Sequence, residues 1–380
     1  MGSLLNNLLR NQYEAMGLEI GASNLKLVEL GGRGPQLKSF AHRPTPPGLF
    51  HDGLISEPGA LAEEIRELVK EARTKKRHVV TALANQVAYT RIIKVPRMDR
   101  KELEEAIRWE AERYIPFPID EVVLDFDLLD DPEEIEEGAE MEVVIAAAKE
   151  ETVVQLVETL FAANLEPLVV DLKPFAGLRP LAGRLTAREN GEAPLTLYLE
   201  VGGESSSLVF LKGERPLLTR TLAVAGRDFT QAIARAFGME PEQAEETKKE
   251  YALATLSTED EEALLELEAP KDRPSPAEIY DAIRGLLIDF TTEVRRSLEF
   301  FKSQFGEESL DQAYVAGGGS KLKGLKGLLS DALGINFSEI DPWESIKIDT
   351  GRFDAGLLQE LGPEFVVPVG LALRGVSKLG

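Results

Sequence analysis

A short glycine-tipped hairpin occurs twice in the sequence, and this repeat constrains the fold more than any other feature. The first copy, GLEIGASNLKLVEL, covers residues 17–30, and the second, YLEVGGESSSLVFL, covers residues 198–211. Aligned without gaps, Glu19 falls on Glu200 and Gly21 on Gly202, and each pair is 181 positions apart. Each copy continues through a glycine-containing turn into a third strand. A repeat with this period predicts two related lobes.

Gly21, Ala22 and Ser23 at the tip of the first bend carry almost no side chain, which leaves backbone N–H groups open to a ligand. Such N–H groups can hold phosphate oxygens. One glycine-tipped bend is a weak signal, because most are ordinary hairpins. Two of them on related lobes predict a nucleotide bound in the cleft between the lobes. The alternative is two unrelated hairpins in an α/β protein.

The bulk composition excludes some classes of function. The chain has 380 residues and a formal net charge of −23, so nucleic acid, whose phosphates it would repel, is excluded as a partner. The chain has no cysteine, which fits a reducing compartment without proving it. No apolar run approaches the roughly 20 residues of a membrane span, and we find no cleavable signal. The expectation is a soluble, cytoplasmic protein of more than one domain.

The first 16 residues suggest an amphipathic helix. Leu4, Leu5, Leu8 and Leu9 fall on one helical face, which Tyr13 continues. Such a segment could lie on a membrane or on a partner. It could equally dock on its own domain as a terminal helix.

Residues 79–165 are expected to form a separate unit inserted in the first lobe. The patterns predict strands at 79–83, 88–95, 122–129 and 141–148 and helices at 100–113 and 151–164. Between the first helix and the third strand, two prolines bracket Phe117 and predict a rigid extended turn. The residues of this turn are Tyr114, Ile115, Pro116, Phe117 and Pro118. The turn either packs on the core or forms part of a groove for a partner peptide.

A third glycine-rich stretch follows a long helix, which is predicted at residues 276–305 from apolar residues at helical spacing. Residues 312–324 predict a strand, three glycines and a helix that begins at about Ser320. Three glycines admit the close approach of a flat ligand, and a helix N-terminus adds hydrogen-bond donors. The glycines are contiguous, so they do not match a dinucleotide-binding fingerprint.

Together these motifs resemble the phosphate-1, phosphate-2 and adenosine motifs of the actin, Hsp70 and sugar-kinase superfamily. The third motif is VAGGGS at residues 315–320. Within that superfamily, the inserted unit resembles the relocated 1C subdomain of FtsA. Three further stretches resemble PilM, the FtsA-like cytoplasmic family of type IV pilus assembly: RWEAERYIPFPI at 108–119, VDLKPF at 170–175 and EVRRSLEFF at 293–301. The resemblance covers nearly the whole chain.

The resemblance implies ATP with Mg²⁺ in the cleft. Both bends would hold phosphate, the three glycines would lie beside the adenosine, and Glu245 and Lys248 would flank the ribose and base. Glu19 and Glu200 would hold Mg²⁺ through water. The residues expected to contact the nucleotide are Gly21, Ala22, Ser23, Asn24, Lys26, Gly202, Gly203, Glu204, Ser205, Ser206, Glu245, Lys248, Gly317, Gly318, Gly319, Ser320 and Lys321.

The two acidic positions depart from the superfamily pattern. The superfamily usually has Asp where this chain has Glu19 and Glu200. Glutamate is one methylene longer, and Mg²⁺ requires near-ideal octahedral geometry, so an attacking water would be poorly aligned. A misplacement of about 1 Å can lower a rate roughly a hundredfold. No catalytic residue is assigned, and we expect ATP binding with little or no hydrolysis.

The resemblance also implies protein partners. These are the N-terminal segment of the inner-membrane protein PilN, bound in or beside the 1C subdomain with residues 114–118 as candidates, and the pilus motor ATPases. The expected function is an ATP-binding cytoplasmic adaptor, peripheral to the inner membrane. The alternative is an active ATPase or small-molecule kinase of the same superfamily, and filament formation is a third option.

The expected fold is α/β, an actin-like ATPase fold with two related lobes. The expected segments are 1–16 at the N-terminus, 17–78 with 166–194 for the first lobe, 79–165 for the insertion, 195–346 for the second lobe, and 347–380 returning to the first lobe. A hinge is expected near residues 191–194, and a final helix over about residues 363–374.

Overall fold

The computed structural model describes residues 14–32, 34–186, 191–255, 273–306 and 309–376. Residues 1–13, most of the expected N-terminal helix, lie outside the described residues. The described end of that segment belongs to the first lobe, because Ala15 and Met16 are fully buried and Met16 begins a strand. Within the described ranges, no helix is long and apolar enough to span a bilayer.

The first lobe is built on a five-stranded sheet in the order β10-β6-β1-β2-β3. β1 and β2, and β2 and β3, pair antiparallel, whereas β6 pairs parallel with both β1 and β10. The strands are β1 (Met16–Ile20), β2 (Asn24–Gly31), β3 (Gln36–Pro44), β6 (His78–Leu83) and β10 (Glu166–Leu172). A short hairpin follows β3, with β4 (Phe50–His51) and β5 (Leu54–Ile55).

The second lobe repeats this arrangement. Its five-stranded sheet has the order β13-β12-β11-β14-β15, with antiparallel pairing from β11 through β13 and parallel pairing from β11 through β15. The strands are β11 (Leu195–Val201), β12 (Ser206–Lys212), β13 (Arg215–Leu222), β14 (Gln312–Ala316) and β15 (Phe337–Glu339). The duplicated hairpin thus begins two sheets with the same pairing order, as the repeat predicts.

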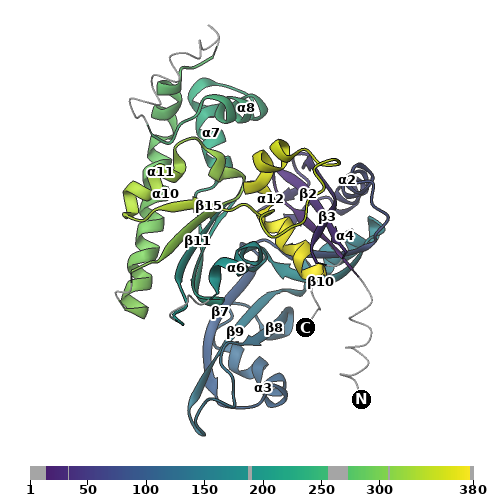
Figure 1. Cartoon of the computed structure of the whole chain (residues 1–380), viewed down its shortest axis with the longest axis vertical. Coiled ribbons are helices and arrows are strands. Elements are labelled where there is room, and N and C mark those ends of the chain that lie inside the picture. The colour runs from purple at the N-terminus through teal and green to yellow at the C-terminus, as the bar shows by residue number, and fades with distance from the viewer. Residues whose placement is uncertain (1–13, 33, 187–190, 256–272, 307–308, 377–380) are drawn as a thin grey trace.

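Helices cover the sheets and fill the space between the lobes (Figure 1). On the first lobe, α2 (Pro58–Glu71) and α4 (Glu150–Ala162) pack on one face and α12 (Ala355–Val376) on the other. The second-lobe helices are α7 (Gly226–Phe237), α8 (Pro241–Tyr251), α10 (Pro276–Phe305) and α11 (Leu325–Leu333). Three short helices lie between the sheets: α5 (Lys173–Leu178), the 3-10 helix η2 (Arg179–Leu181) and α6 (Ala182–Leu185).

A small inserted unit projects from the first lobe (Figure 1). Its three-stranded sheet has the order β7-β9-β8 and packs on a core of its own. The elements are β7 (Ala88–Pro96), α3 (Arg100–Glu112), η1 (Ile119–Glu121), β8 (Val122–Leu128) and β9 (Glu140–Lys149).

The two ends of the predicted insertion pack with the first lobe. β6 pairs with β1 and β10, and α4 shares a core with α2 and β1 through Leu156 and Leu160. β6 is almost wholly buried along its length, as is usual for an interior strand of a sheet that is covered on both faces. We therefore propose that the insertion runs only from residue 88 to residue 149.

The C-terminal helix is longer than the sequence predicts. It begins at Ala355 rather than at about residue 363, and Pro363 and Pro368 lie inside it. An interior proline costs a helix about 3 kcal/mol or more, which is why the sequence favours a start at Pro363. Burial offsets this cost, because Phe365 and Leu371 in the same helix are fully buried.

The helix predicted to begin at Ser320 begins later. Residues Gly318–Lys321 form a short 3-10 turn, η3, in which the Ser320 hydroxyl donates to the Gly317 carbonyl at 2.7 Å. α11 starts at Leu325, after Gly324, whose φ of +80° favours glycine. The helix N-terminus expected directly behind the three glycines is therefore absent there.

Candidate functional site

The two glycine bends lie against each other at the boundary between the lobes. The N–H groups of Gly21 and Gly202 each donate to the carbonyl three residues later, at 3.1 Å in both cases. The second bend approaches the first so closely that a Cβ on Gly203 would lie 2.5 Å from the Ser23 Oγ. The two halves of the sequence repeat thus meet at one place.

The carboxylate of Glu19, two residues before the first bend, is paired with two lysines. Lys26, its cross-strand partner, donates to Oε2 at 3.1 Å, and Lys173 at the start of α5 donates to Oε1 at 3.2 Å. Burial would raise the pKa of the Glu19 carboxyl, but the charges of the two lysines outweigh it and lower that pKa below its ordinary value. Burial would lower the pKa of Lys26, whereas Glu19 and Glu364 raise it overall. Glu19 and Lys26 are therefore both charged at neutral pH.

Glu200 occupies the equivalent position in the second lobe and lacks such partners. Its cross-strand neighbour is Ser207, whose hydroxyl donates to Oε2 at 3.4 Å. Burial and the nearby charge of Glu19 raise the pKa of Glu200 from 4.5 to about 7. On the same strand, the buried hydroxyl of Tyr198 has no hydrogen-bond partner within the described part of the chain. Burial and the two glutamates raise the pKa of Tyr198 well above its ordinary value.

Glu204, in the second bend, joins the lobes. Its carboxylate contacts His51 Nδ1 at 2.7 Å, accepts from the Asp52 N–H at 2.9 Å and pairs with Arg227. The side chain is only 6% exposed. Because both oxygens are engaged and a carboxylate repels phosphate, Glu204 fits a contact between lobes better than a contact to phosphate.

The three glycines pack tightly on the end of β11. The Gly317 N–H donates to the carbonyl of Pro363 in α12 at 2.8 Å. A Cβ on Gly317 or Gly319 would lie 2.4 Å from atoms of Val201, a separation that real Cβ contacts do not reach. Close backbone approach, rather than a ligand, is therefore sufficient reason for glycine at these two positions.

Gly318 and Lys321 lie beside α12. The nearest atom to a Cβ on Gly318 would be Glu364 Cγ at 3.6 Å, an ordinary contact distance. Lys321 donates to Glu364 at 2.8 Å, and Ser320 is buried. Glu364 also acts on Lys26 in the first lobe, so η3 and the first bend face the same region.

Glu245 and Lys248 form a pair beside the second bend. Lys248 Nζ lies 2.6 Å from Glu245 Oε2 and donates to the Thr230 hydroxyl at 2.8 Å and the Gly226 carbonyl at 3.0 Å. The Gly226 N–H in turn donates to the Gly202 carbonyl at 2.9 Å. Burial lowers the pKa of Lys248; burial would raise that of Glu245, but the charge of Lys248 lowers it.

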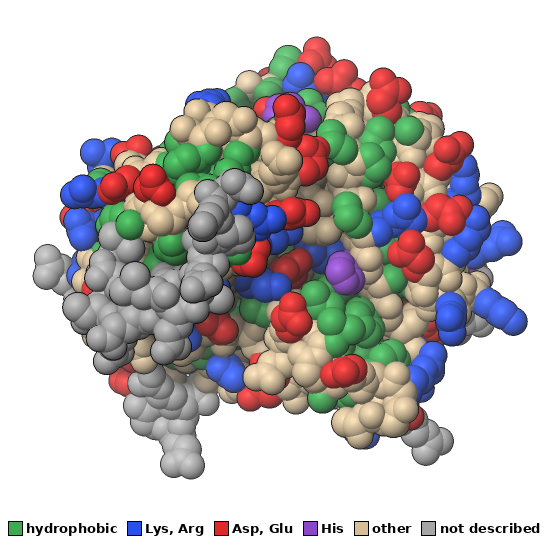
Figure 2. Space-filling view, turned by 90° about the horizontal axis from the view of Figure 1, so that it is seen from above, with side chains coloured by type: hydrophobic (Ala, Val, Ile, Leu, Met, Phe, Trp, Pro, Cys, Tyr) green, Lys and Arg blue, Asp and Glu red, His purple; other side chains and the backbone are tan. Residues whose placement is uncertain are grey.

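The remaining bend residues differ in exposure. Ser23 is exposed, and Ala22, Asn24 and Ser205 are partly exposed. Ser206 is buried, and its hydroxyl donates to the Val224 carbonyl at 2.8 Å. Seen from above, the molecule has a hollow in which basic and acidic side chains lie next to one another (Figure 2).

The aromatic turn at residues 114–118 is partly packed and partly exposed. Ile115 is buried in the core of the inserted unit. Tyr114 is half-buried, and the Arg91 guanidinium lies over its ring at 5.0 Å. Pro118 is exposed. The turn therefore packs on the core at Ile115 and reaches the surface at Pro118.

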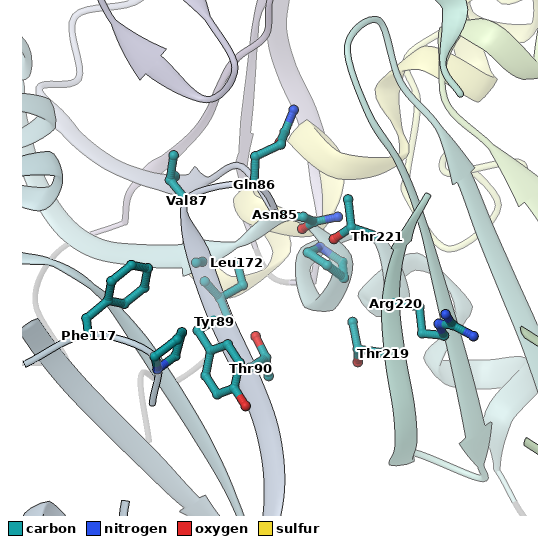
Figure 3. A pocket seen from close by; sticks show the side chains of 13 residues that line it. Asn85, Gln86, Val87, Tyr89, Thr90, Phe117, Leu172, Thr219, Arg220 and Thr221 are labelled. Atoms are coloured by element: carbon teal, nitrogen blue, oxygen red, sulfur yellow. The ribbon is translucent and has the colours of Figure 1, made fainter. Parts of the chain in front are cut away.

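Pro116 and Phe117 line a pocket of about 310 Å³ to which three parts of the chain contribute. The inserted unit supplies these two residues and Tyr89, the first lobe supplies Leu172, and β13 of the second lobe supplies residues 219–221. Figure 3 shows Tyr89 and Phe117 on one side and the side chains of β13 on the other. The pocket therefore lies where the insertion meets both lobes.

Two parts of these sites are missed by sequence reasoning. Lys173 directly follows a parallel strand, at the end of the sheet where ligands of α/β proteins gather, and this position was an available signal. The β13 wall of the pocket has no local signal, because Thr219 and Thr221 meet the insertion only in the folded chain.

Comparison with known proteins gives two family matches. A family model described as type IV pilus assembly protein PilM matches residues 17–266. A second model, described as cell division protein FtsA, matches residues 197–357. Among solved structures, the chain is similar to one described as the PilM-PilN type IV pilus biogenesis complex, with 51% identity over 96% of this chain and 99% of that chain and a TM-score of 0.85.

More distant structures share the fold. The ethanolamine utilization protein EutJ from Carboxydothermus hydrogenoformans is 14% identical over 94% of this chain and 89% of its own, with a TM-score of 0.52. MreB 5 of Spiroplasma citri, solved bound to AMPPNP, is 11% identical over 95% of each chain, with a TM-score of 0.54. The fold is the actin-like ATPase fold that the sequence predicts. Because the PilM model matches more than half of the chain and the 51% identity spans nearly all of it, the chain belongs to the PilM family of type IV pilus assembly proteins.

Proposed function

We propose that the chain is a cytoplasmic adaptor of type IV pilus assembly that binds the N-terminal segment of PilN in the pocket beside the inserted unit. The observation that carries this proposal is the pocket of about 310 Å³ at residues 116 and 117, in a chain 51% identical to a protein solved as a PilM-PilN complex. The volume accommodates a few side chains, so the rest of a bound segment would extend along the surface.

The walls of the pocket suit an extended peptide. β7 and β13 are edge strands of their sheets, and an edge strand offers unpaired N–H and C=O groups to an added strand. Phe117, Tyr89 and Leu172 supply apolar surface for side chains. Main-chain pairing would then give affinity, and the apolar wall would select side chains.

Calorimetric titration with a synthetic peptide of the PilN N-terminal segment tests this proposal. Phe117→Ala removes an aromatic wall of the pocket and is expected to weaken binding by at least about tenfold. Trp109→Ala is the matched control, because Trp109 is an aromatic residue of the same inserted unit that is 76% exposed on α3 and is not a lining residue. Absence of peptide binding, or equal loss in both variants, would contradict the placement.

We propose further that ATP binds at the boundary between the lobes. The two bends meet there, with Gly203 against Ser23. The N–H groups of Gly21 and Gly202 donate within their own bends, so phosphate oxygens would accept from the other N–H groups of the bends. Glu245, Lys248 and Gly318 would lie beside the ribose and base. We expect the chain to hold ATP with little or no hydrolysis, because the Glu19 carboxylate is paired with two lysines. Sustained phosphate release by the purified chain would favour an active ATPase instead.

Nucleotide and peptide are proposed to be coupled through the second lobe. Arg215 at the start of β13 pairs with Asp130 and with Glu142 of the insertion, each at 2.6 Å. This contact links the insertion to the lobe that forms the third wall of the pocket. A ligand that holds the two lobes in one arrangement also stabilises the pocket geometry that belongs to that arrangement. ATP is therefore expected to raise the affinity for the peptide, and Arg215→Ala to reduce that effect.

The location and the remaining partners follow from the same proposal. The chain would be held at the inner membrane through PilN, and other surfaces, such as the one around Trp109, would meet the pilus motor ATPases. Flotation with lipid vesicles tests the location. The chain is expected to float only with vesicles that carry PilN, and flotation with plain vesicles would contradict indirect attachment.

A further inference from the structure

The donor atoms at the proposed phosphate site do not fit the Mg²⁺ that the family resemblance implies. Both oxygens of Glu19 already accept from lysine ammonium groups, at 3.1 Å from Lys26 and 3.2 Å from Lys173. Mg²⁺ requires near-ideal octahedral oxygen coordination and keeps several waters. A hydrated ion on Glu19 would have to displace a lysine or lie beside two positive charges.

The second expected ligand does not compensate. Glu200 is 8% exposed and accepts from the Ser207 hydroxyl at 3.4 Å. It faces Glu19 and the two lysines, all of which act on it electrostatically. The chain's own cations therefore already lie at the place where a metal would be held between the two carboxylates.

We propose that Lys26 and Lys173, paired on Glu19, supply the positive charge for the phosphates, so that the nucleotide binds this cleft without a divalent cation. This inference rests on the proposed nucleotide site. The two side chains are only 11% and 13% exposed, so their ammonium groups are held in place before a ligand arrives. Glu364 also acts on Lys26 but is itself paired with Lys321, so the two lysines and Glu19 together keep one positive charge for the ligand to neutralise.

The lysines also retain hydrogen-bonding capacity. An ammonium group has three donors, and each lysine uses one of them on Glu19. Lys26 lies on β2, just after the first bend, and Lys173 is the first residue of α5. Phosphate oxygens at the bend could therefore accept from both lysines while Glu19 stays in place. Each ammonium group would then lie between the Glu19 carboxylate and a phosphate.

Titration calorimetry of ATP into the full chain, stripped of nucleotide, tests the inference. One titration contains excess Mg²⁺ and the other excess EDTA. The expected dissociation constants differ by less than about fivefold. A larger loss in EDTA would overturn the inference while leaving the nucleotide site intact. Absence of ATP binding in both titrations would overturn the proposed nucleotide site itself.

Variants identify the residues responsible. Lys173→Met is expected to weaken ATP binding in EDTA by about tenfold or more. The matched control is Lys326→Met, which removes a lysine from an exposed pair with Glu339 on α11 and β15 and is expected to change the affinity less than about twofold. Equal affinities of Lys173→Met and Lys326→Met would overturn the role of Lys173. The Mg²⁺ and EDTA comparison uses the unaltered chain, so it does not depend on how the variants fold.

Discussion

Glu19 and Glu200 occupy the same position in two copies of one hairpin, yet their carboxyl groups have opposite electrostatic environments. Across the strand pair, Glu19 faces Lys26, whereas Glu200 faces Ser207. Both glutamates are buried. The lysines lower the pKa of Glu19, whereas burial and the charge of Glu19 raise that of Glu200 to about 7.

The difference shows how strongly one cross-strand neighbour affects the ionisation of a buried carboxyl. Two buried carboxyls close together do not both ionise easily unless a cation compensates one of them. The first lobe supplies that cation twice, from Lys26 and Lys173, and the second lobe supplies a weak hydroxyl donor. Duplication of the hairpin therefore preserves the backbone geometry while the chemistry of the two sites diverges.

The largest expected effect on stability comes from removing the charge of Glu19. Glu19→Gln leaves Lys26 and Lys173 without their counter-charge, and a buried pair broken in this way costs about 3 to 5 kcal/mol. Urea denaturation measures the loss in the free energy of unfolding. Glu339→Gln, at an exposed pair with Lys326, is the control and is expected to cost less than about 1 kcal/mol. Similar small losses in both variants would mean that the lysines do not depend on Glu19.

The raised pKa of Glu200 predicts that the stability of the chain depends on pH. The folded chain holds a proton on Glu200 up to about pH 7, whereas an unfolded glutamate releases it near 4.5. The folded state binds more protons in that window, so the free energy of unfolding falls as the pH rises through it. The raised pKa corresponds to a loss of about 3 kcal/mol, complete above pH 7.

Comparison of the parent chain with Glu200→Gln isolates this contribution. Histidines titrate in the same range, and the chain has three, but they are common to both proteins. The amide cannot ionise, so the variant is expected to lose less stability than the parent between pH 5 and pH 8, as urea denaturation at a series of pH values would show. Parallel pH profiles would contradict the raised pKa of Glu200.

Lys26→Met would make the first hairpin resemble the second. Glu19 would keep only Lys173, and the expected loss of stability is about 2 kcal/mol, less than for Glu19→Gln, because one ion pair remains. Lys26 also lowers the pKa of Glu200, so the pH midpoint of stability should move upward. An unchanged midpoint would indicate that the two hairpins act independently.

Ser207→Ala is expected to have the smallest effect. It removes one hydrogen bond to Glu200, of 3.4 Å, which contributes about 1 kcal/mol or less. The loss should appear mainly above pH 7, where the carboxylate is ionised and needs the donor. A loss that is equally large at pH 5 would assign Ser207 a packing role instead.

The local pattern predicts elements whose signals are complete in a short stretch. The duplicated hairpins and α10 lie where periodicity and glycine place them, because alternation, helical spacing and turn residues are properties of neighbouring positions. The same reasoning misplaces the starts of α11 and α12. Before α11, the hydrogen bond from Ser320 to Gly317 overrides the local start signal. In α12, the burial of Phe365 does so.

The electrostatics of the site depends on contacts between distant positions. Lys173 reaches Glu19 across 154 positions, and Glu204 reaches His51 across 153. Neither partner can be read from the spacing of residues along the chain. The sequence therefore predicts that the two bends belong to one site, but it does not predict which side chains neutralise which.

The two bends are proposed to hold one nucleotide between the lobes. The most direct test is to load the purified full chain with ATP, remove the unbound nucleotide, denature the protein and quantify the released nucleotide by chromatography. We expect about one intact ATP per chain, from a site that holds its nucleotide through the separation. Recovery of no nucleotide from a correctly folded chain would contradict it.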